Sequence, residues 1–242
     1  MPDQIFNEQR LAEIYDLFEG ERVDLPHYLA IAAELDAHSV LDVGCGTGTF
    51  ACLLAERGFE VAGVDPAAAS LEIARTKPGA QRVRWIEGYA TSLPALAVDL
   101  ATMTGNVSNV FLSDQEWRAT LDGVRAALRP GGYLVFESVD PAGEPWLGWG
   151  PENTHIRREA PGAGAFETWH EVTGVDGDLV NSRRTYVFAA DGATLTSEST
   201  RRYPARAVIE DSLVSAGYTV TDVRDAPDRP GRELVFIARK PA

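Results

Sequence analysis

A glycine-rich segment and a later carboxylate carry the clearest chemical signal in the sequence. The run V-L-D-V-G-C-G-T-G occupies residues 40–48, where a short apolar stretch leads into spaced glycines and then into a helix-like stretch. Glycine lacks a Cβ, so its backbone can approach a ligand closely, and the following helix offers free N–H groups at its first turn. Asp65 ends the next apolar run, where a carboxylate can accept hydrogen bonds from both hydroxyls of a ribose. Together these features predict a nucleoside-binding turn.

The spacing of the glycines limits which class of ligand the loop can bind. Gly44-x-Gly46-x-Gly48 differs from the G-x-G-x-x-G spacing of loops that hold a dinucleotide pyrophosphate. Asp42 stands just before the loop, and its negative charge is a poor neighbour for a pyrophosphate but a good one for a cation. We therefore favour a nucleoside that carries positive charge, such as S-adenosylmethionine with its ammonium and sulfonium groups. An NAD-dependent oxidoreductase is disfavoured by this spacing and by the antiparallel hairpin expected at the end of the chain.

Alternating strand and helix patterns place this turn in a parallel sheet. Short apolar runs predict buried strands, and apolar residues at helical spacing predict helices between them. The clearest helix start is Ser113, which with Glu116 has the S-x-x-E form of a capping box. Such alternation indicates a sheet covered by helices on both faces. The expected strands are 40–43, 61–64, 83–87, 98–103, 133–139, 218–223 and 234–238, and the expected helices are 11–18, 27–36, 49–57, 66–76, 113–128 and 205–216.

The segment after the fifth strand differs in composition and predicts an insertion. Residues 140–165 are rich in proline and glycine and lack periodicity, which indicates a long loop. Strand-like runs over 166–203 are separated by Asp176-Gly177 and Asp191-Gly192, dipeptides typical of two-residue hairpin turns, so we expect an antiparallel meander. Two-residue turns at both sites would pair Thr173 with Val180, His170 with Arg183, Trp169 with Arg184, and Thr185 with Glu198.

Three motifs together resemble the class I S-adenosylmethionine-dependent methyltransferases. They are V-L-D-V-G-C-G-T-G at 40–48, G-V-D-P at 63–66 and L-R-P-G-G at 128–132, in matching order and spacing. The resemblance implies an α/β fold with a doubly wound, Rossmann-like sheet of seven strands, six parallel and one antiparallel. The cofactor would lie at the carboxyl ends of the first four strands. We expect one methyltransferase domain over 1–242, its core at 1–139 and 204–242, and residues 140–203 inserted as a small antiparallel lid.

The resemblance also implies which residues hold the cofactor. The family usually has G-D-A after the third strand, whereas this chain has Gly88-Tyr89-Ala90, so a carboxylate contact to the adenine is not expected here. Tyr89 would stack on the ring or make no contact, and the Ala90 backbone can still serve. The other matching positions give Gly44, Cys45, Gly46 and Gly48 as the cofactor loop, Asp42 near the methionine ammonium, Asp65 on the ribose, Pro66 near the adenine, Thr104, Gly105 and Asn106 near the methionine and its methyl group, and Tyr15 folded over the cofactor.

Aromatic and polar residues of the insertion are the candidates for contact with a substrate. The insertion leaves the fifth strand at the sheet edge where ligands bind in open α/β folds, so we expect it to cover the methyl group. Its aromatic side chains could line a pocket or could anchor the loop to the sheet, and an antiparallel sheet with one apolar face could instead form a homodimer. The candidate substrate contacts are Trp146, Trp149, Trp169, Arg184 and Tyr186, with Trp169 and Arg184 expected to make a cation–π contact, and the candidate general bases are His155 and His170.

Composition restricts the partners. A formal net charge of −14 argues against nucleic acid and against an anionic membrane surface, because both need clustered Lys and Arg. Two cysteines and four scattered histidines indicate neither a disulfide framework nor a zinc site. The acidic N-terminal sequence lacks the regions of a signal peptide and no apolar run is long enough for a membrane span, so we expect a cytoplasmic protein. No Asp-Asn pair follows the fourth strand, where metal-dependent relatives carry one, so we expect no metal.

The resemblance therefore implies a methyltransferase that moves a methyl group from S-adenosyl-L-methionine to O or N of a small molecule. The protein would contribute mainly proximity and orientation, because the sulfonium is already an excellent leaving group. The alternative is a protein that binds the cofactor without catalysis, as a sensor or partner subunit. An insertion that encloses a pocket reaching the methyl group favours the enzyme, and a flat or filled insertion favours the binding protein.

Overall fold

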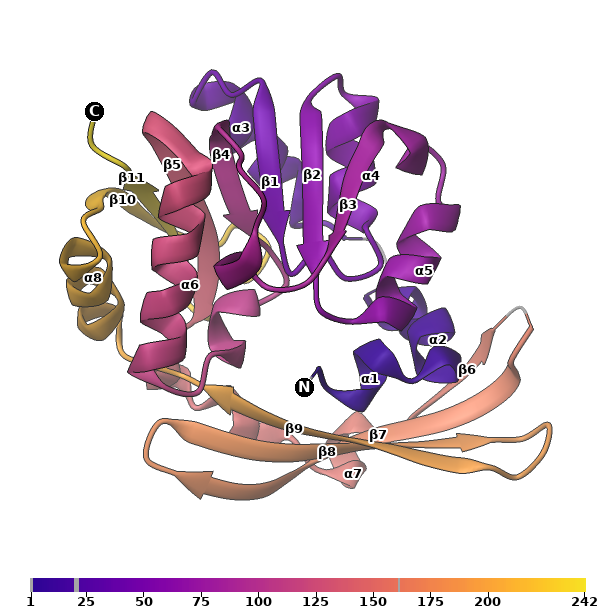
Figure 1. Ribbon diagram of the computed structural model, residues 1–242. Helices are drawn as coiled ribbons and strands as arrows, with labels where there is room; N and C mark the ends of the chain where they lie inside the picture. The colour runs from indigo at the N-terminus through magenta and orange to yellow at the C-terminus, as the bar shows by residue number, and fades with distance from the viewer. Residues whose placement is uncertain (1, 20–21, 161) are drawn as a thin grey trace.

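The computed structural model describes residues 2–19, 22–160 and 162–242, and its larger sheet has the expected class of fold (Figure 1). The seven strands lie in the order β10-β11-β5-β4-β1-β2-β3. β11 runs antiparallel to both of its neighbours, and the other pairs are parallel, which gives six parallel strands and one reversed strand. The strands are β1 (Ser39–Val43), β2 (Glu60–Asp65), β3 (Val83–Glu87), β4 (Val98–Met103), β5 (Leu128–Val139), β10 (Thr219–Asp225) and β11 (Glu233–Arg239).

Helices cover both faces of this sheet because successive strand residues point to opposite sides. On β1, Val40 packs in one apolar cluster with residues of α3 and α4, and Leu41 packs in a second cluster with residues of α6 and α8. The capping box predicted at Ser113 and Glu116 starts α6 and is confirmed. The helices of this layer are α3 (Leu25–Glu34), α4 (Thr49–Glu56), α5 (Ala68–Thr76), α6 (Asp114–Ala127) and α8 (Arg206–Ser215), with short 3-10 turns η1 (Ala80–Arg82), η2 (Ala90–Ser92) and η3 (Val107–Val110).

Two expected boundaries on the larger sheet are wrong. Pro66 was expected at the first helical position, but it lies in the turn before α5, whose N-cap is Ala67. The Asp65 carboxylate accepts a hydrogen bond from the Ala67 amide at 2.8 Å and so holds that turn. The fifth strand begins at Leu128 directly after α6, so the L-R-P-G-G segment forms the start of β5.

A second, smaller sheet lies across the carboxyl ends of the parallel strands (Figure 1). Its strands are antiparallel in the order β6-β7-β8-β9 and fall between β5 and α8 in the chain. The expected long loop is in part structured, because β6 pairs with the start of β7, yet β6 is mostly exposed and has no apolar alternation to mark it. The elements are η4 (Pro141–Gly143), η5 (Pro145–Gly148), α7 (Pro151–Thr154), β6 (Ile156–Ala160), β7 (Gly164–Asp176), β8 (Leu179–Phe188) and β9 (Thr194–Arg202).

The register predicted for the small sheet is wrong, for three local reasons. A bulge shifts the β7–β8 pairing between Val172 and Gly174, and the second hairpin turn is longer than two residues, with Val187 opposite Thr194. At the first turn Asp176 faces Leu179, so the turn lies one residue later than the Asp-Gly dipeptide indicated. The observed pairs are Val175 with Val180, His170 with Arg184, Trp169 with Thr185, Thr185 with Thr196, and Arg183 with Glu198.

Two N-terminal helices, α1 (Gln4–Asn7) and α2 (Gln9–Glu19), join the small sheet to the core (Figure 1). The predicted apolar stripe of α2 buries Leu11 and Ile14 against Phe166, Tyr186 and Phe188 of the small sheet. On the other side, the Ser70 hydroxyl of α5 donates a hydrogen bond to the Phe6 carbonyl at 2.7 Å. The apolar face of the small sheet is therefore covered within the chain. Among the described residues, no helix has the length and apolar character that crossing a membrane requires.

Candidate active site

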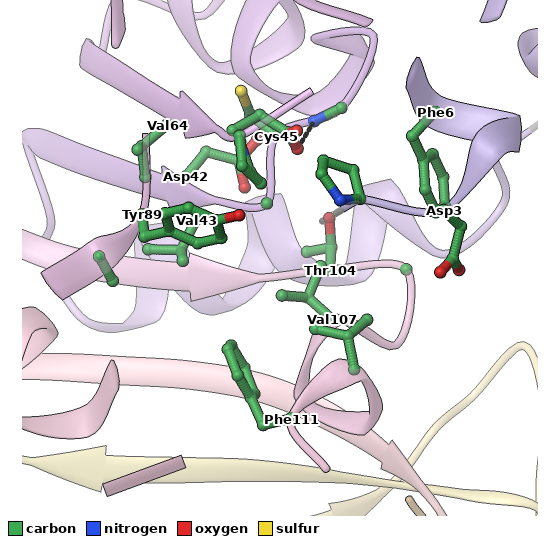
Figure 2. A pocket seen from close by; sticks show the side chains of 18 of the residues that line it. Asp3, Phe6, Asp42, Val43, Cys45, Val64, Tyr89, Thr104, Val107 and Phe111 are labelled. Carbon is green, nitrogen blue, oxygen red and sulfur yellow. Dashed lines mark hydrogen bonds between the residues drawn. The ribbon is translucent and has the colours of Figure 1, made fainter. Parts of the chain in front are cut away.

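A cavity of about 640 Å³ lies between the two sheets, at the carboxyl ends of the parallel strands. Its volume is that of a typical small-molecule site. The loops after β1, β2, β3 and β4 form one wall, and residues of α1, α2, α6 and β9 form the others (Figure 2). Of the predicted cofactor residues, those that line the cavity are Tyr15, Asp42, Gly44, Cys45, Gly46, Asp65, Pro66, Tyr89, Ala90, Thr104 and Gly105; Gly48 and Asn106 do not.

The three loop glycines are required for different reasons. All three adopt left-handed backbone, with φ of 70° at Gly44, 51° at Gly46 and 77° at Gly48. A Cβ on Gly44 would lie 2.6 Å from Val107, and one on Gly48 would lie 2.5 Å from the Trp85 ring, so these two also permit close packing. A Cβ on Gly46 would meet no protein atom within 4 Å. Gly46 therefore presents bare backbone to the cavity.

The Asp65 carboxylate connects the end of β2 to the glycine loop. One oxygen accepts from the Gly46 amide and the other from the Ala67 amide, both at 2.8 Å. Burial raises the pKa of Asp65, and the two backbone hydrogen bonds oppose that rise. A carboxylate has about four acceptor positions, so both oxygens can still accept from ligand hydroxyls.

Opposite charges meet at one end of the cavity. Asp42 is buried, accepts a hydrogen bond from the Thr102 hydroxyl at 3.1 Å, and burial raises its pKa to about 7. Arg22 also lines the cavity, pairs with Asp24 at 2.6 Å, and lies 3.9 Å from where a Gly105 Cβ would be. An acidic and a basic group side by side suit the ammonium and carboxylate of an amino acid. Sequence reasoning missed Arg22, because no motif marks it.

Cys45 lines the cavity but is not a reactive thiol. Its side chain is 8% exposed, and burial raises the pKa of the thiol well above its usual value, with further repulsion from Asp42 and Asp65. A thiol needs a lowered pKa to act as a nucleophile at neutral pH. Its place against β2, 3.0 Å from where a Gly63 Cβ would lie, indicates packing.

Aromatic side chains stand at two ends of the cavity (Figure 2). The Tyr89 side chain is 53% exposed although it lines the cavity, so its ring is available for stacking on a ligand. Tyr15 meets Phe6 edge to face, with ring centroids 5.2 Å apart, and both line the cavity. The described structure thus brings Tyr15 from the N-terminal helix to the same cavity as the glycine loop.

The small sheet reaches the cavity through β9. The lining residues there are Glu198 to Arg201, and the Arg201 guanidinium pairs with Asp3 at 2.6 Å across the cavity mouth. None of the predicted substrate or catalytic residues of the insertion lines this cavity in the part of the chain described. Those residues are Trp146, Trp149, Trp169, Arg184, Tyr186, His155 and His170.

These residues instead pack the insertion together. Trp149 stacks on His170 with ring centroids 4.5 Å apart, and Trp146 packs on Tyr203 at 5.0 Å. His155 lies 5.8 Å from the Trp169 ring and 3.2 Å from a Glu167 oxygen. Tyr186 is fully buried against α2. The expected contact of Trp169 with Arg184 is wrong, because Arg184 faces His170 and Trp169 points to the opposite side of the sheet.

The electrostatics of His170 also argue against a general base. Burial, together with the nearby Arg184 and Arg201, lowers the pKa of His170 to about 4. A base with so low a pKa accepts a proton poorly at neutral pH. His170 thus acts as a neutral aromatic partner of Trp149.

Part of the cavity wall is formed by residues that the sequence analysis did not select. Val110, Phe111 and Leu112 line it, and Val110 and Leu112 are each 38% exposed. Glu116, expected only to cap α6, both caps that helix and lines the cavity. These residues carry no shared motif, and only the topology brings them together. The charged residues lining the cavity are Asp3, Asp16, Asp42, Asp65, Glu116 and Glu198 against Arg22 and Arg201.

Comparison with known proteins agrees with this architecture. Residues 40–132 match the model of a methyltransferase domain. The cypemycin N-terminal methyltransferase of a Streptomyces species is 32% identical over 146 residues, which cover 59% of this chain and 60% of the relative. The chain spans 42% to 60% of the length of the first curated relatives that it matches.

Solved structures share the fold over nearly the whole chain. An S-adenosylmethionine-dependent methyltransferase from Clostridium acetobutylicum superposes with a TM-score of 0.77 at 18% identity and covers 97% of this chain and 99% of its own. An amino pentose methyltransferase from Micromonospora echinaspora, solved with S-adenosylmethionine bound, gives 0.69 at 23% identity and covers 94% and 96%. The fold is that of Rossmann-like methyltransferases. Over residues 40–132 the chain is similar to a methyltransferase domain, and over nearly its whole length it has the fold of S-adenosylmethionine-dependent methyltransferases.

Proposed function

We propose that the protein is an S-adenosyl-L-methionine-dependent methyltransferase whose acceptor is the amine nitrogen of a small molecule. The observation that carries the proposal is the single cavity in which the glycine loop, Asp42, Asp65 and Arg22 face residues of β9. One half of that cavity offers partners for a ribose and for an amino-acid zwitterion. The other half leaves room for a second molecule, as a two-substrate transfer requires.

The cofactor half suits S-adenosylmethionine residue by residue. Asp65 would accept from the ribose hydroxyls, Asp42 would pair with the ammonium, and Arg22 with the carboxylate. Tyr89 would stack on the adenine. Bare backbone at Gly46 leaves space for the ligand, since a Cβ there would meet no protein atom within 4 Å. When bound, the cofactor supplies an electrophilic methyl group on a positively charged sulfur.

The charge of the cavity favours an amine over other acceptors. Its lining carries six carboxylates and two guanidiniums among the described residues, so an anionic acceptor would be repelled and a cationic one attracted. Asp3 before α1 and Glu116 in the first turn of α6 lie outside the cofactor loop and offer oxygens that can take the proton an amine must lose. Asp16, in contrast, accepts a hydrogen bond from Thr47 of that loop at 2.5 Å and pairs with Lys77 at 2.6 Å. Several similar proteins are described as N-methyltransferases, including a glycine N-methyltransferase from mouse and a sugar N-methyltransferase from Streptoalloteichus.

The residues of the chain would act mainly by position. The cavity walls would orient the methyl group toward the acceptor, and the apolar segment Val110–Leu112 would hold the body of the acceptor. The size of the cavity supports this function over a binding protein without catalysis, because a sensor needs no second space beside its cofactor.

The test pairs binding with turnover. Calorimetry with S-adenosylhomocysteine should show binding, and release of S-adenosylhomocysteine from the cofactor should follow addition of amines but not of alcohols of the same carbon skeleton. Binding without turnover over a broad amine and hydroxyl panel would favour the sensor instead. Turnover with the alcohols alone would keep the enzyme and overturn the amine acceptor.

A further inference from the structure

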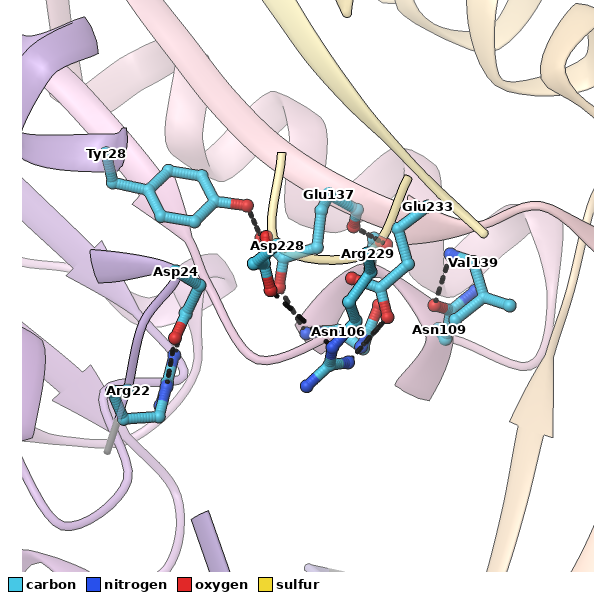
Figure 3. Close-up of polar contacts among 11 residues, drawn as sticks. Arg22, Asp24, Tyr28, Asn106, Asn109, Glu137, Val139, Asp228, Arg229 and Glu233 are labelled. Carbon is cyan, nitrogen blue, oxygen red and sulfur yellow. Dashed lines mark hydrogen bonds and ion pairs between the residues drawn. The ribbon is translucent and has the colours of Figure 1, made fainter. Parts of the chain in front are cut away.

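Glu137 is a buried carboxylate outside the cavity that holds two segments of the cavity wall. It lies on β5, its side chain is 3% exposed, and it does not line the cavity. Its oxygens accept hydrogen bonds from the Tyr28 hydroxyl of α3 and from the Asn106 amide after β4, the latter at 2.5 Å (Figure 3). Each of these donors belongs to a segment that reaches the cavity.

The first segment is the turn after β4. Gly105 and Asn106 both adopt left-handed backbone, with φ of 78° and 61°, and this conformation costs free energy for a residue with a side chain. The Asn106 side chain donates a second hydrogen bond to Glu233 at 3.0 Å. Thr104 and Gly105 line the cavity, and Val107 fills the space beside Gly44 of the cofactor loop. A shift of this turn would therefore move two parts of the cofactor wall.

The second segment runs from Arg22 to Tyr28. Arg22 lines the cavity, and its guanidinium is bound by Asp24 in two hydrogen bonds of 2.8 and 2.6 Å. Tyr28 is 5% exposed and packs edge to face on Phe50 with centroids 6.0 Å apart. Its hydroxyl is thus directed at Glu137 by packing. Glu137 fixes the distance between the Arg22 segment and the turn at Gly105.

We propose that Glu137 is a positioning residue of the cofactor site, which holds the Arg22 segment and the Thr104–Val107 turn in the geometry that binds the amino-acid end of S-adenosylmethionine. This role rests on the proposed function. Glu137 touches no reacting atom and acts through the two segments that it joins.

The arrangement also makes cofactor affinity depend on pH. Both hydrogen-bond donors point at Glu137, so the ionised carboxylate fits best, yet burial raises its pKa to about 7. Below that pH the protonated acid accepts less well, so affinity should rise as pH increases through 7. The charged and titratable groups around Glu137 are Arg22 and Asp24 before α3, Tyr28 on α3, Asp228 and Arg229 before β11, and Glu233 on β11 (Figure 3).

The experiment compares three variants of the full chain. Glu137→Ala removes the acceptor, Glu137→Gln keeps an acceptor oxygen but cannot ionise, and Ser138→Ala is the matched control. Ser138 is the next residue of β5, is 2% exposed, and bonds to Asn109 instead of the cavity turn. S-adenosylhomocysteine affinity is measured by calorimetry from pH 6 to 8.5, with melting temperatures and amide hydrogen exchange of the 104–107 peptide.

We expect Glu137→Ala to weaken binding about tenfold at pH 8 and to speed exchange at 104–107, while the fold persists. Glu137→Gln should stay within about threefold of the wild type at pH 8 and show a smaller pH dependence around 7 than the wild type, because Asp42, whose pKa is also about 7, still titrates there. Ser138→Ala should lower the melting temperature without changing affinity or exchange at 104–107. If Glu137→Ala does not fold, the weaker pH dependence of Glu137→Gln relative to the wild type still distinguishes the role.

Unchanged affinity in Glu137→Ala, or an equal loss in Ser138→Ala, would overturn the positioning role and leave the proposed function standing. A wild-type affinity that does not change between pH 6 and 8.5 would also overturn it. A wild-type chain that does not bind S-adenosylhomocysteine at all would overturn the proposed function, and the positioning role would fall with it.

Discussion

One wall of the cavity consists mainly of backbone atoms, and the other consists mainly of side chains. The core wall is mostly backbone: loop glycines at positive φ, and a carboxylate that bonds the Gly46 and Ala67 amides at 2.8 Å. The wall from the small sheet is side chains on β9, joined to the N-terminal segment by the pair of Asp3 and Arg201. Backbone geometry is hard to vary and suits a ligand that never changes. Side chains are easily exchanged and suit an acceptor that differs between relatives.

The walls also differ in what supports them. The loops of the core wall directly follow the central strands, whose residues such as Val40 and Leu41 are completely buried. The β9 wall is held by α1 and α2, which lie between the small sheet and the core (Figure 1); the Ile5 amide of α1 donates a hydrogen bond to the Ser197 hydroxyl of β9 at 3.0 Å. Changes in the core wall should therefore affect cofactor binding, and changes in the β9 wall should affect the acceptor alone.

The largest expected effect is at Gly46. Gly46→Val should reduce S-adenosylhomocysteine affinity on the order of 100-fold or more, because the new side chain would fill space that the ligand needs. The left-handed backbone, with φ of 51°, adds strain of about 1–2 kcal/mol, which a stable fold can bear. Calorimetry measures the affinity, and thermal melting measures the fold.

Gly58→Val is the matched control for this change. Gly58 also has positive φ, at 92°, and a Cβ there would meet no atom within 4 Å, but it follows α4 outside the cavity. Gly58→Val should lose a similar amount of folding stability and keep the wild-type affinity for S-adenosylhomocysteine. Normal binding by Gly46→Val would mean that this loop does not hold the cofactor, and the contrast between the two walls would disappear.

Asp65 should give the next largest effect. Asp65→Ala removes two hydrogen bonds within the loop and those expected to the ribose, so binding should weaken by about 1–3 kcal/mol. The side chain is only 8% exposed, so some loss of fold stability should accompany it, more than a carboxylate at the surface would cause. Asp65→Asn keeps the shape and should recover part of the stability but less of the binding. Equal affinity in all three proteins, measured by calorimetry, would contradict the ribose role.

A change on the β9 wall should separate acceptor from cofactor. Ser199 lines the cavity, and Ser199→Phe should raise the KM for an amine acceptor about tenfold by occupying part of its space. Cofactor affinity should stay within about twofold of the wild type. Thr196→Phe is the control, because Thr196 is exposed on the other face of the same strand. A matching rise in KM in the control, or a large loss of cofactor affinity in Ser199→Phe, would show that the two walls do not act separately.

The core wall was predictable because its chemistry is local in sequence. Gly44, Gly46 and Asp65 lie at strand ends that apolar runs mark clearly, and parallel strands bring their carboxyl ends to one edge. Even there Gly48 and Asn106 differ from expectation. Gly48 makes room for the Trp85 ring, and Asn106 turns toward Glu137 and Glu233, contacts that no spacing rule contains.

The β9 wall was not predictable because it depends on register. The first turn lies one residue later than expected and a bulge follows near Gly174, so the β7–β8 pairing is shifted by one residue, and a one-residue shift changes which side chains share a face. The longer second turn shifts the β8–β9 pairing by two residues, which keeps the faces but changes which residues stand opposite each other. The composition of the insertion suggested a binding pocket, because it is rich in aromatic residues, but side chains such as Trp149 and Trp169 pack against other residues of the insertion. The proposed acceptor side includes Val110–Leu112, at the end of η3 and in the link to α6, and Glu116 in the first turn of α6, none of which carries a motif in the sequence.

The smallest expected effect tests whether the histidine region belongs to the cavity at all. Folding lowers the pKa of His170 from 6.5 to about 4, chiefly by burial against Trp149. The unfolded chain therefore binds more protons in this range, and the stability that neutral His170 contributes is complete above pH 6.5 and is lost as pH falls from 6.5 toward 4.

His170→Phe keeps an aromatic ring beside Trp149 but cannot titrate. Between pH 7 and pH 5 the wild type should therefore lose more melting temperature than the variant, by on the order of 2 °C, because other titrating groups are common to both proteins. Methyl transfer at pH 7.5 should be the same in both, since His170 does not line the cavity. A variant that folds normally, binds S-adenosylhomocysteine and yet loses turnover would return His170 to the catalytic site and would place the acceptor against β7 instead of β9.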